Sequence, residues 1–153
     1  MINRNINTTN HVFFSSTWAS KVASLIAQNA EAFLKLHSSA YDAATRTVNF
    51  TVGCGAFNAL PNNYKVVIAL TEDSIVACQL DIDANPQQVN NYVNRHILRA
   101  TINTTWGDDV ASQPDAVTKY IKLYSYTLPT TVVPEQCHLV AYVYDATDRK
   151  SVV

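Results

Sequence analysis

A stretch rich in β-branched residues occupies positions 64–82 and reads YKVVIALTEDSIVACQLDI. Tyr64–Leu70 and Ile75–Ile82 each have the composition and length of a β-strand. Residues 71–73, which include Glu72 and Asp73, are polar and separate the two runs. We predict two strands joined by a tight acidic turn, in which both carboxylates serve the turn.

The segments before this stretch also alternate with a period of two. Thr47–Val52 places apolar residues on one face and polar residues on the other, which indicates a half-buried strand. Phe33–Tyr41 alternates more weakly, and residues 42–45 form the expected hairpin loop between the two. The apolar face of the second strand is formed by Val48, Phe50 and Val52.

Three later segments complete the predicted strands: Arg95–Ile102, Tyr120–Leu128 and Leu139–Tyr144. In the first of them His96, Leu98, Ala100 and Ile102 share one face, which predicts a buried, hydrogen-bonded histidine. A helix is the alternative there, because Val93, Ile97 and Ala100 also align. The polar segment Asp108–Val117 is the longest expected loop.

A helix is predicted only near the start, at Ser15–Asn29, where Trp18, Val22, Leu25 and Ile26 recur at helical spacing. Without a second helix to connect parallel strands, we expect an antiparallel β-sandwich. It has about seven strands and is preceded by this one N-terminal α-helix.

Composition excludes several classes of function. Charged residues make up 15% of the chain and its net charge is −1, so electrostatic capture of nucleic acid is not expected. No apolar run has the length of a membrane span, so direct membrane insertion is not expected either. Cys54, Cys78 and Cys137 lack zinc-ligand spacing, which predicts no metal site. They are small buried residues, or one bridge and a free thiol.

The pattern of reactive residues predicts no catalytic residue and no cofactor. A serine nucleophile on a strained turn and a phosphate-binding loop both need glycine-rich motifs, and the chain has three glycines. A hydrolase using Asp73 and His96 is possible only if the two meet in a cleft. Arg95 and Arg99 share the outward face of their strand, where they either bind an anionic group or remain solvated.

Tyrosines cluster on the last two predicted strands. If these strands pair as a hairpin with their aliphatic faces inward, five tyrosines and a lysine form an outward platform for a partner. In the alternative, the tyrosines face inward with their hydroxyls at the rim. The predicted contact surface comprises Tyr120, Lys122, Tyr124, Tyr126, Tyr142, Tyr144, Arg95 and Arg99.

Leu70–Val76, Tyr92–Ala100, Trp106 and Gly107 together resemble the Omp28-related outer-membrane proteins, and the likeness extends over most of the chain. Asn94 departs from the pattern, because a further histidine is common there. The resemblance implies a Gram-negative cell-envelope lipoprotein, in the outer membrane or periplasm, with a thioredoxin-like half before an immunoglobulin-like sandwich. Residues 1–30 are similar to the end of the former, and residues 31–153 to the latter.

We therefore expect a non-catalytic interaction domain. Its partners are the upstream thioredoxin-like domain of the same protein and a protein or glycan ligand. The alternative is an accessory domain of a thioredoxin-like thiol oxidoreductase, which a free, reactive cysteine would favour.

Overall fold

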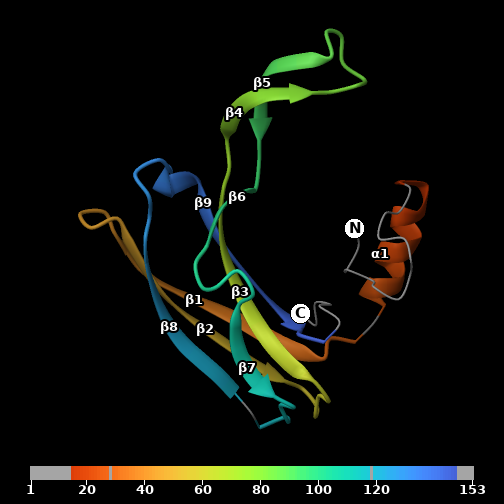
Figure 1. The fold of residues 1–153 in the computed structure, drawn as a ribbon, viewed down its shortest axis with the longest axis vertical. Helices are drawn as coiled ribbons and strands as arrows, with labels where there is room; N and C mark the ends of the chain where they lie inside the picture. The colour runs from red at the N-terminus through yellow and green to blue at the C-terminus, as the bar shows by residue number, and fades with distance from the viewer. Residues whose placement is uncertain (1–14, 28, 118, 148–153) are drawn as a thin grey trace.

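Two antiparallel sheets face each other in the computed structural model, which describes residues 15–27, 29–117 and 119–147 (Figure 1). The first sheet has the order β1 (Ala32–Asp42), β2 (Thr47–Ala56) and β8 (Lys119–Thr127). The second is built on β3 (Asn63–Glu72), which pairs along one edge with β9 (Cys137–Asp145). Along its other edge β3 pairs with β6 (Ile97–Thr101) and β7 (Asp108–Ser112).

The core lies between β2 and β3. Because successive strand residues point to opposite faces, Phe50 and Val52 of β2 share one side, and Val66, Ile68 and Leu70 of β3 share another. These five are the largest fully buried side chains among the residues that the structure describes. Burying each one stabilises the fold by about 1.5–3 kcal/mol relative to exposure. The predicted antiparallel sandwich is therefore confirmed.

A separate two-stranded sheet, β4 (Ile75–Leu80) and β5 (Gln88–Asn94), extends beyond the sandwich (Figure 1). Both strands predicted on either side of residues 71–73 are present, and only residues 73 and 74 separate them. β3 and β4 lie in different sheets, so this short connection leads the chain out of the sandwich and does not fold β4 back against β3. Seven of the nine strands in the described chain build the sandwich, and β5 was not predicted.

The predicted helix is present as a 3-10 turn at Ser15–Thr17 followed by α1 (Trp18–Ile26). Val22 and Ile26 on its apolar side are exposed. Residues 1–14, which hold the rest of the predicted thioredoxin-like end, lie outside the described residues. The proposed boundary at residues 30 and 31 stays a prediction.

Two connections differ from expectation. The predicted loop at Asp108–Val117 begins with strand β7, which pairs with the start of β3. The connection from β8 to β9 carries a 3-10 turn at Pro134–Gln136 and crosses from one sheet to the other.

Candidate functional site

The tyrosines of β8 face the core. β8 pairs with β2 along its length, with Tyr124 opposite Phe50 and Tyr126 opposite Val48. Cross-strand neighbours project from the same face of a sheet, so these tyrosines take the core side. Tyr124 is buried and stacks on Phe50 with ring centroids 5.5 Å apart. Tyr120 and Tyr126 are half-buried against the core, so the inward alternative is correct for β8.

The predicted platform of five outward tyrosines is wrong. It required β8 and β9 to pair as a hairpin, but β8 pairs with β2 and β9 pairs with β3. On β9, Tyr142 is exposed, whereas Tyr144 is buried and its hydroxyl donates to the Trp106 carbonyl at 2.6 Å. The outer face of β8 instead presents Ile121 and Leu123, which are 73% and 68% exposed.

Arg99 is held by a buried carboxylate. Its Nε lies 3.2 Å from Oε2 of Glu72, whose side chain is 4% exposed. The other carboxylate oxygen of Glu72 accepts the Val133 N–H at 2.8 Å. Glu72 is therefore a strand residue that ties the β8–β9 connection to β3, so its predicted role in a turn is wrong. Arg95 is exposed, as predicted for an outward residue.

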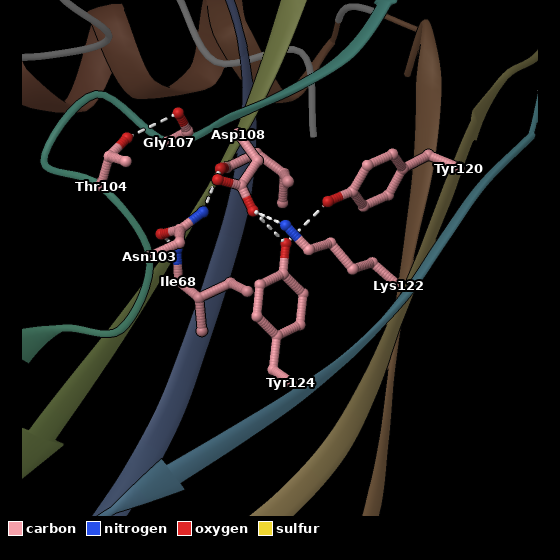
Figure 2. Close-up of polar contacts among 9 residues, drawn as sticks. Ile68, Asn103, Thr104, Gly107, Asp108, Tyr120, Lys122 and Tyr124 are labelled. Atoms are coloured by element: carbon pink, nitrogen blue, oxygen red, sulfur yellow. Dashed lines mark hydrogen bonds and ion pairs between the residues drawn. The ribbon is translucent and has the colours of Figure 1, made fainter.

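A polar cluster lies where the free edge of β8 meets the start of β7 (Figure 2). Oδ2 of Asp108 accepts hydrogen bonds from Nζ of Lys122 at 2.8 Å and from the hydroxyl of Tyr124 at 2.7 Å. The hydroxyls of Tyr120 and Tyr124 are 2.7 Å apart. One carboxylate of the second sheet thus binds two side chains of the first, and the cluster links the sheets. We call these four residues the Asp108 cluster.

A tight turn positions Asp108. Gly107 has a φ of +78° and donates its N–H to the Thr104 carbonyl at 2.8 Å, while the Thr104 hydroxyl donates back to the Gly107 carbonyl at 2.7 Å. A Cβ at Gly107 would lie 2.3 Å from the Val66 carbonyl oxygen, so glycine is required. Just before the turn, Asn103 donates to that carbonyl and accepts the Ile68 N–H. The Asn103 side chain thereby makes the hydrogen bonds to the β3 backbone that a neighbouring strand would otherwise make.

The electrostatics of the Asp108 cluster favour a fixed ion pair. Burial by itself raises the pKa of Asp108, but the hydrogen bonds from Lys122 and Tyr124 outweigh it and hold that pKa below its usual range. Burial of Tyr124, and next its hydrogen bond to Asp108, raise the pKa of its hydroxyl, which therefore stays protonated. The arrangement suits inter-sheet attachment and offers no activated nucleophile.

The contact surface predicted from the sequence included Tyr120, Lys122 and Tyr124 but did not include Asp108. The available signal was Gly107, one of three glycines, directly before an acidic residue. The signal indicates a turn and does not reveal which strand the carboxylate faces.

A second cluster lies at the base of the β4–β5 hairpin. Asp73 accepts the backbone N–H of His96, and its two carboxylate oxygens lie 3.2 Å from Nδ1 of His96 and 3.4 Å from Nε2 of His138. The His96 backbone hydrogen bond, and then the charges of the two imidazoles, lower the pKa of Asp73. We call these three residues the Asp73 cluster.

The prediction of a buried His96 is wrong, because its side chain is 74% exposed. β6 begins one residue later, and His96 has a φ of +54°, which takes it out of the strand alternation. Asp73 and His96 do meet, as the hydrolase hypothesis requires, but at an exposed position. Water there screens the charges that a catalytic pair would use.

The described residues contain no group of three or more His, Cys, Asp or Glu side chains arranged to hold a metal ion. A small apolar pocket lined by Cys54, Leu60, Tyr64 and their neighbours has a volume of about 10 Å³, enough for at most one water. Within the described part of the chain no helix is long and apolar enough to cross a membrane.

The three cysteines are free and differ in exposure. Cys54 is buried, Cys137 is intermediate and Cys78 is exposed on β4. Burial raises the pKa of the Cys54 thiol to about 11, and it also raises the pKa of Cys137. Cys78 is thus the most accessible thiol.

Comparison with known proteins gives one family. No match was found among curated proteins or solved structures. The family model of outer membrane protein Omp28 matches residues 1–153, the whole chain. The chain therefore belongs to the Omp28 family of outer membrane proteins and is located in the cell envelope.

Proposed function

We infer that this chain is a non-catalytic interaction domain of an outer-membrane lipoprotein and that it contacts a protein partner through the β4–β5 hairpin. The observation that carries the proposal is the apolar surface of this hairpin. Its exposed aliphatic residues are Val76, Leu80, Ile82 and Val93.

The low stability of an isolated two-stranded sheet supports the proposal that the hairpin binds a partner. An isolated two-stranded sheet is at best marginally stable in water, and β4 and β5 pack on each other rather than on the sandwich. Leu80 and Ile82 are 75% and 80% exposed near the turn. Contiguous exposed apolar residues mark protein interfaces, because burial on a partner removes them from water.

A binding role also agrees with the polar clusters. The carboxylate of Asp108 and the hydroxyl of Tyr124 already bind partners within the fold. The Asp73 carboxylate holds the hairpin base. These groups thus act between elements of the chain and leave the hairpin as the better contact surface.

Crosslinking in the intact protein tests this proposal. A photo-reactive residue replaces Ile82 in the full chain, expressed in its own bacterium. The matched control replaces Ile26, which is 78% exposed but lies on α1. We expect a discrete adduct with another protein from position 82 and none from position 26. Equal labelling at both positions, or none at position 82, would contradict the proposal.

The alternative, an accessory domain of a thiol oxidoreductase, is favoured by the exposure of Cys78 on the same hairpin. An exposed thiol can exchange with a disulfide of a substrate, whereas Cys54 cannot reach one. Replacing Cys78 with serine separates the two candidates, because crosslinking from position 82 survives in an interaction domain. Loss of all adducts in this variant would favour the redox role.

A further inference from the structure

The hairpin turn combines apolar and acidic side chains. Between Ile75 and Asn94 the charged residues are Asp81 and Asp83, which alternate with Leu80 and Ile82. Leu80 and Ile82 are the most exposed aliphatic residues of the hairpin. We call Leu80, Asp81, Ile82 and Asp83 the tip patch.

The outer face of the first sheet combines apolar and basic side chains. In register, Gly53 lies between Lys35 and Ile121, and Thr51 lies between His37 and Leu123. Lys119 is two positions before Ile121 on the same face. We call Lys35, His37, Lys119, Ile121 and Leu123 the sheet patch.

The centre of the sheet patch is low and open. Gly53 carries no side chain, and a Cβ built there meets only backbone oxygens, at 3.9 Å. An aliphatic side chain from outside can therefore rest on this row beside Ile121. The acidic residue of this sheet, Asp42, is at the far end of β1, where it accepts hydrogen bonds from the turn residues Ala44 and Thr45.

The tip patch and the sheet patch are complementary in charge, and both carry exposed apolar side chains. Leu80 and Ile82 offer apolar area for Ile121 and Leu123, while Asp81 and Asp83 offer negative charge for the two lysines. Complementary charge around an apolar centre is the usual arrangement of a specific interface. Within one molecule the hairpin points away from the sandwich (Figure 1), so the tip patch reaches a sheet patch only on another molecule.

We propose that the tip patch of one copy docks on the sheet patch of a second copy of this chain. The proposal rests on the proposed function, since it names the protein partner of the hairpin. The two surfaces differ, so the contact is head-to-tail, and every dimer retains one free tip patch and one free sheet patch. Such a contact produces open chains or closed rings.

Complementation between two defective variants tests the contact. Leu80→Ser with Ile82→Ser removes the apolar part of the tip patch, and Ile121→Ser with Leu123→Ser removes that of the sheet patch. The native chain at about 100 μM is expected to sediment as dimers and larger species, a range in which micromolar contacts are populated. Each variant alone is expected to be monomeric. Their mixture is expected to form heterodimers and nothing larger, because each contributes one intact patch.

Charge reversal provides an independent second arm. Asp81→Lys with Asp83→Lys should abolish assembly, and a partner carrying Lys35→Glu and Lys119→Glu should restore it. Ile26→Ser, on α1, is the control for loss of an exposed apolar residue and should assemble like the native chain. Circular dichroism of every variant verifies folding.

A monomeric native chain, assembly by the tip variant alone, or a mixture without heterodimers would overturn the proposal. These outcomes are distinct from failure of the proposed function. A monomeric chain that still gives a protein adduct from position 82 in the cell would retain a hairpin partner of another identity. A chain without such an adduct would lose both.

Discussion

Gly107 occupies a position that no other residue fits. Its φ is +78°, and a Cβ would lie 2.3 Å from a carbonyl oxygen of β3. Gly107→Ala should therefore lower the free energy of unfolding by at least about 2 kcal/mol, through backbone strain and displacement of the Asp108 turn. Urea denaturation measures this loss.

Gly53 is the matched control for that substitution. It lies inside β2, where a built Cβ makes only ordinary van der Waals contacts at 3.9 Å, and alanine in a strand interior is more favourable than glycine by about 0.5–1 kcal/mol. Gly53→Ala should thus be neutral or stabilising. Equal losses at both glycines would contradict the role of Gly107.

Thiol reactivity should follow burial. With an aromatic disulfide reagent, we expect Cys78 to react first in the native protein, Cys137 more slowly, and Cys54 only after unfolding. The raised pKa of Cys54, about 11, leaves little thiolate at neutral pH. The variant Cys78→Ser should lose the fast phase alone. A fast phase that survives this substitution would show that another thiol is open to solvent.

At the scale of the element, the hairpin base should respond to charge on the Asp73 cluster. The Asp73 carboxylate accepts the His96 backbone N–H, and this hydrogen bond is the main cause that lowers the pKa of Asp73. A neutral side chain at position 73 would accept that hydrogen bond more weakly. Asp73→Asn should therefore reduce amide protection at Ser74 and His96 at neutral pH, which hydrogen exchange measures.

The middle of β2 is the internal control for this measurement. Amides there should keep their protection in Asp73→Asn, because β2 lies in the other sheet. A parallel loss in β2 would indicate global destabilisation instead. Unchanged protection at Ser74 and His96 would contradict the role of Asp73 at the hairpin base.

Whether the sequence predicted a strand and its buried face correctly depended on how apolar residues are divided between the two faces of the strand. β2 was recognised because only one face is apolar, whereas both faces of β8 carry large apolar side chains. The burial of Tyr124 was decided by its partner Phe50 across the sheet, and pairing between distant strands is not visible in local alternation. β5 was missed because its sequence, QVNNYVN, is mostly polar. His96 was misassigned because a positive φ interrupts the pattern at that residue.

At the scale of the whole molecule, the Asp108 cluster joins the two sheets, and its strength depends on pH. The folded state lowers the pKa of Asp108, so the ionised form favours folding. This contribution is complete above about pH 4, the ordinary value for aspartate, and is lost as the pH falls through the lower folded-state pKa.

Asp108→Asn should expose this dependence. At neutral pH the loss of two charge-assisted hydrogen bonds should cost about 2 kcal/mol of unfolding free energy. As the pH falls from about 4 through the lowered folded-state pKa of Asp108, the difference from the native chain should shrink, because the native carboxylate becomes protonated. Asp83→Asn, at an exposed loop position, is the control. A difference that stays constant with pH would exclude the charged contact as its cause.

The sandwich class and six of its seven strands were predictable because hydrophobic periodicity reports burial directly, whereas β7 was expected to be a loop and the predicted seventh strand, β4, lies outside the sandwich. The links between the sheets were not predictable, since Asp108 and Lys122 belong to different strands and meet only after both sheets have formed. The ion pair of Glu72 and Arg99 was also not predicted, although both lie in one sheet, because the sequence assigned Glu72 to a turn and Arg99 to an outward face.

The pairing of β3 with β6 has a consequence for the evolution and the engineering of this protein. Glu72 and Ile97 are register partners, so the polypeptide leaves the sandwich at Asp73 and returns beside its point of departure at His96. An insert between two such neighbours can be shortened, lengthened or exchanged while the flanking ladder keeps its register. The hairpin is thus a replaceable module, through which related proteins can diversify binding and a foreign peptide can be displayed on an unchanged scaffold.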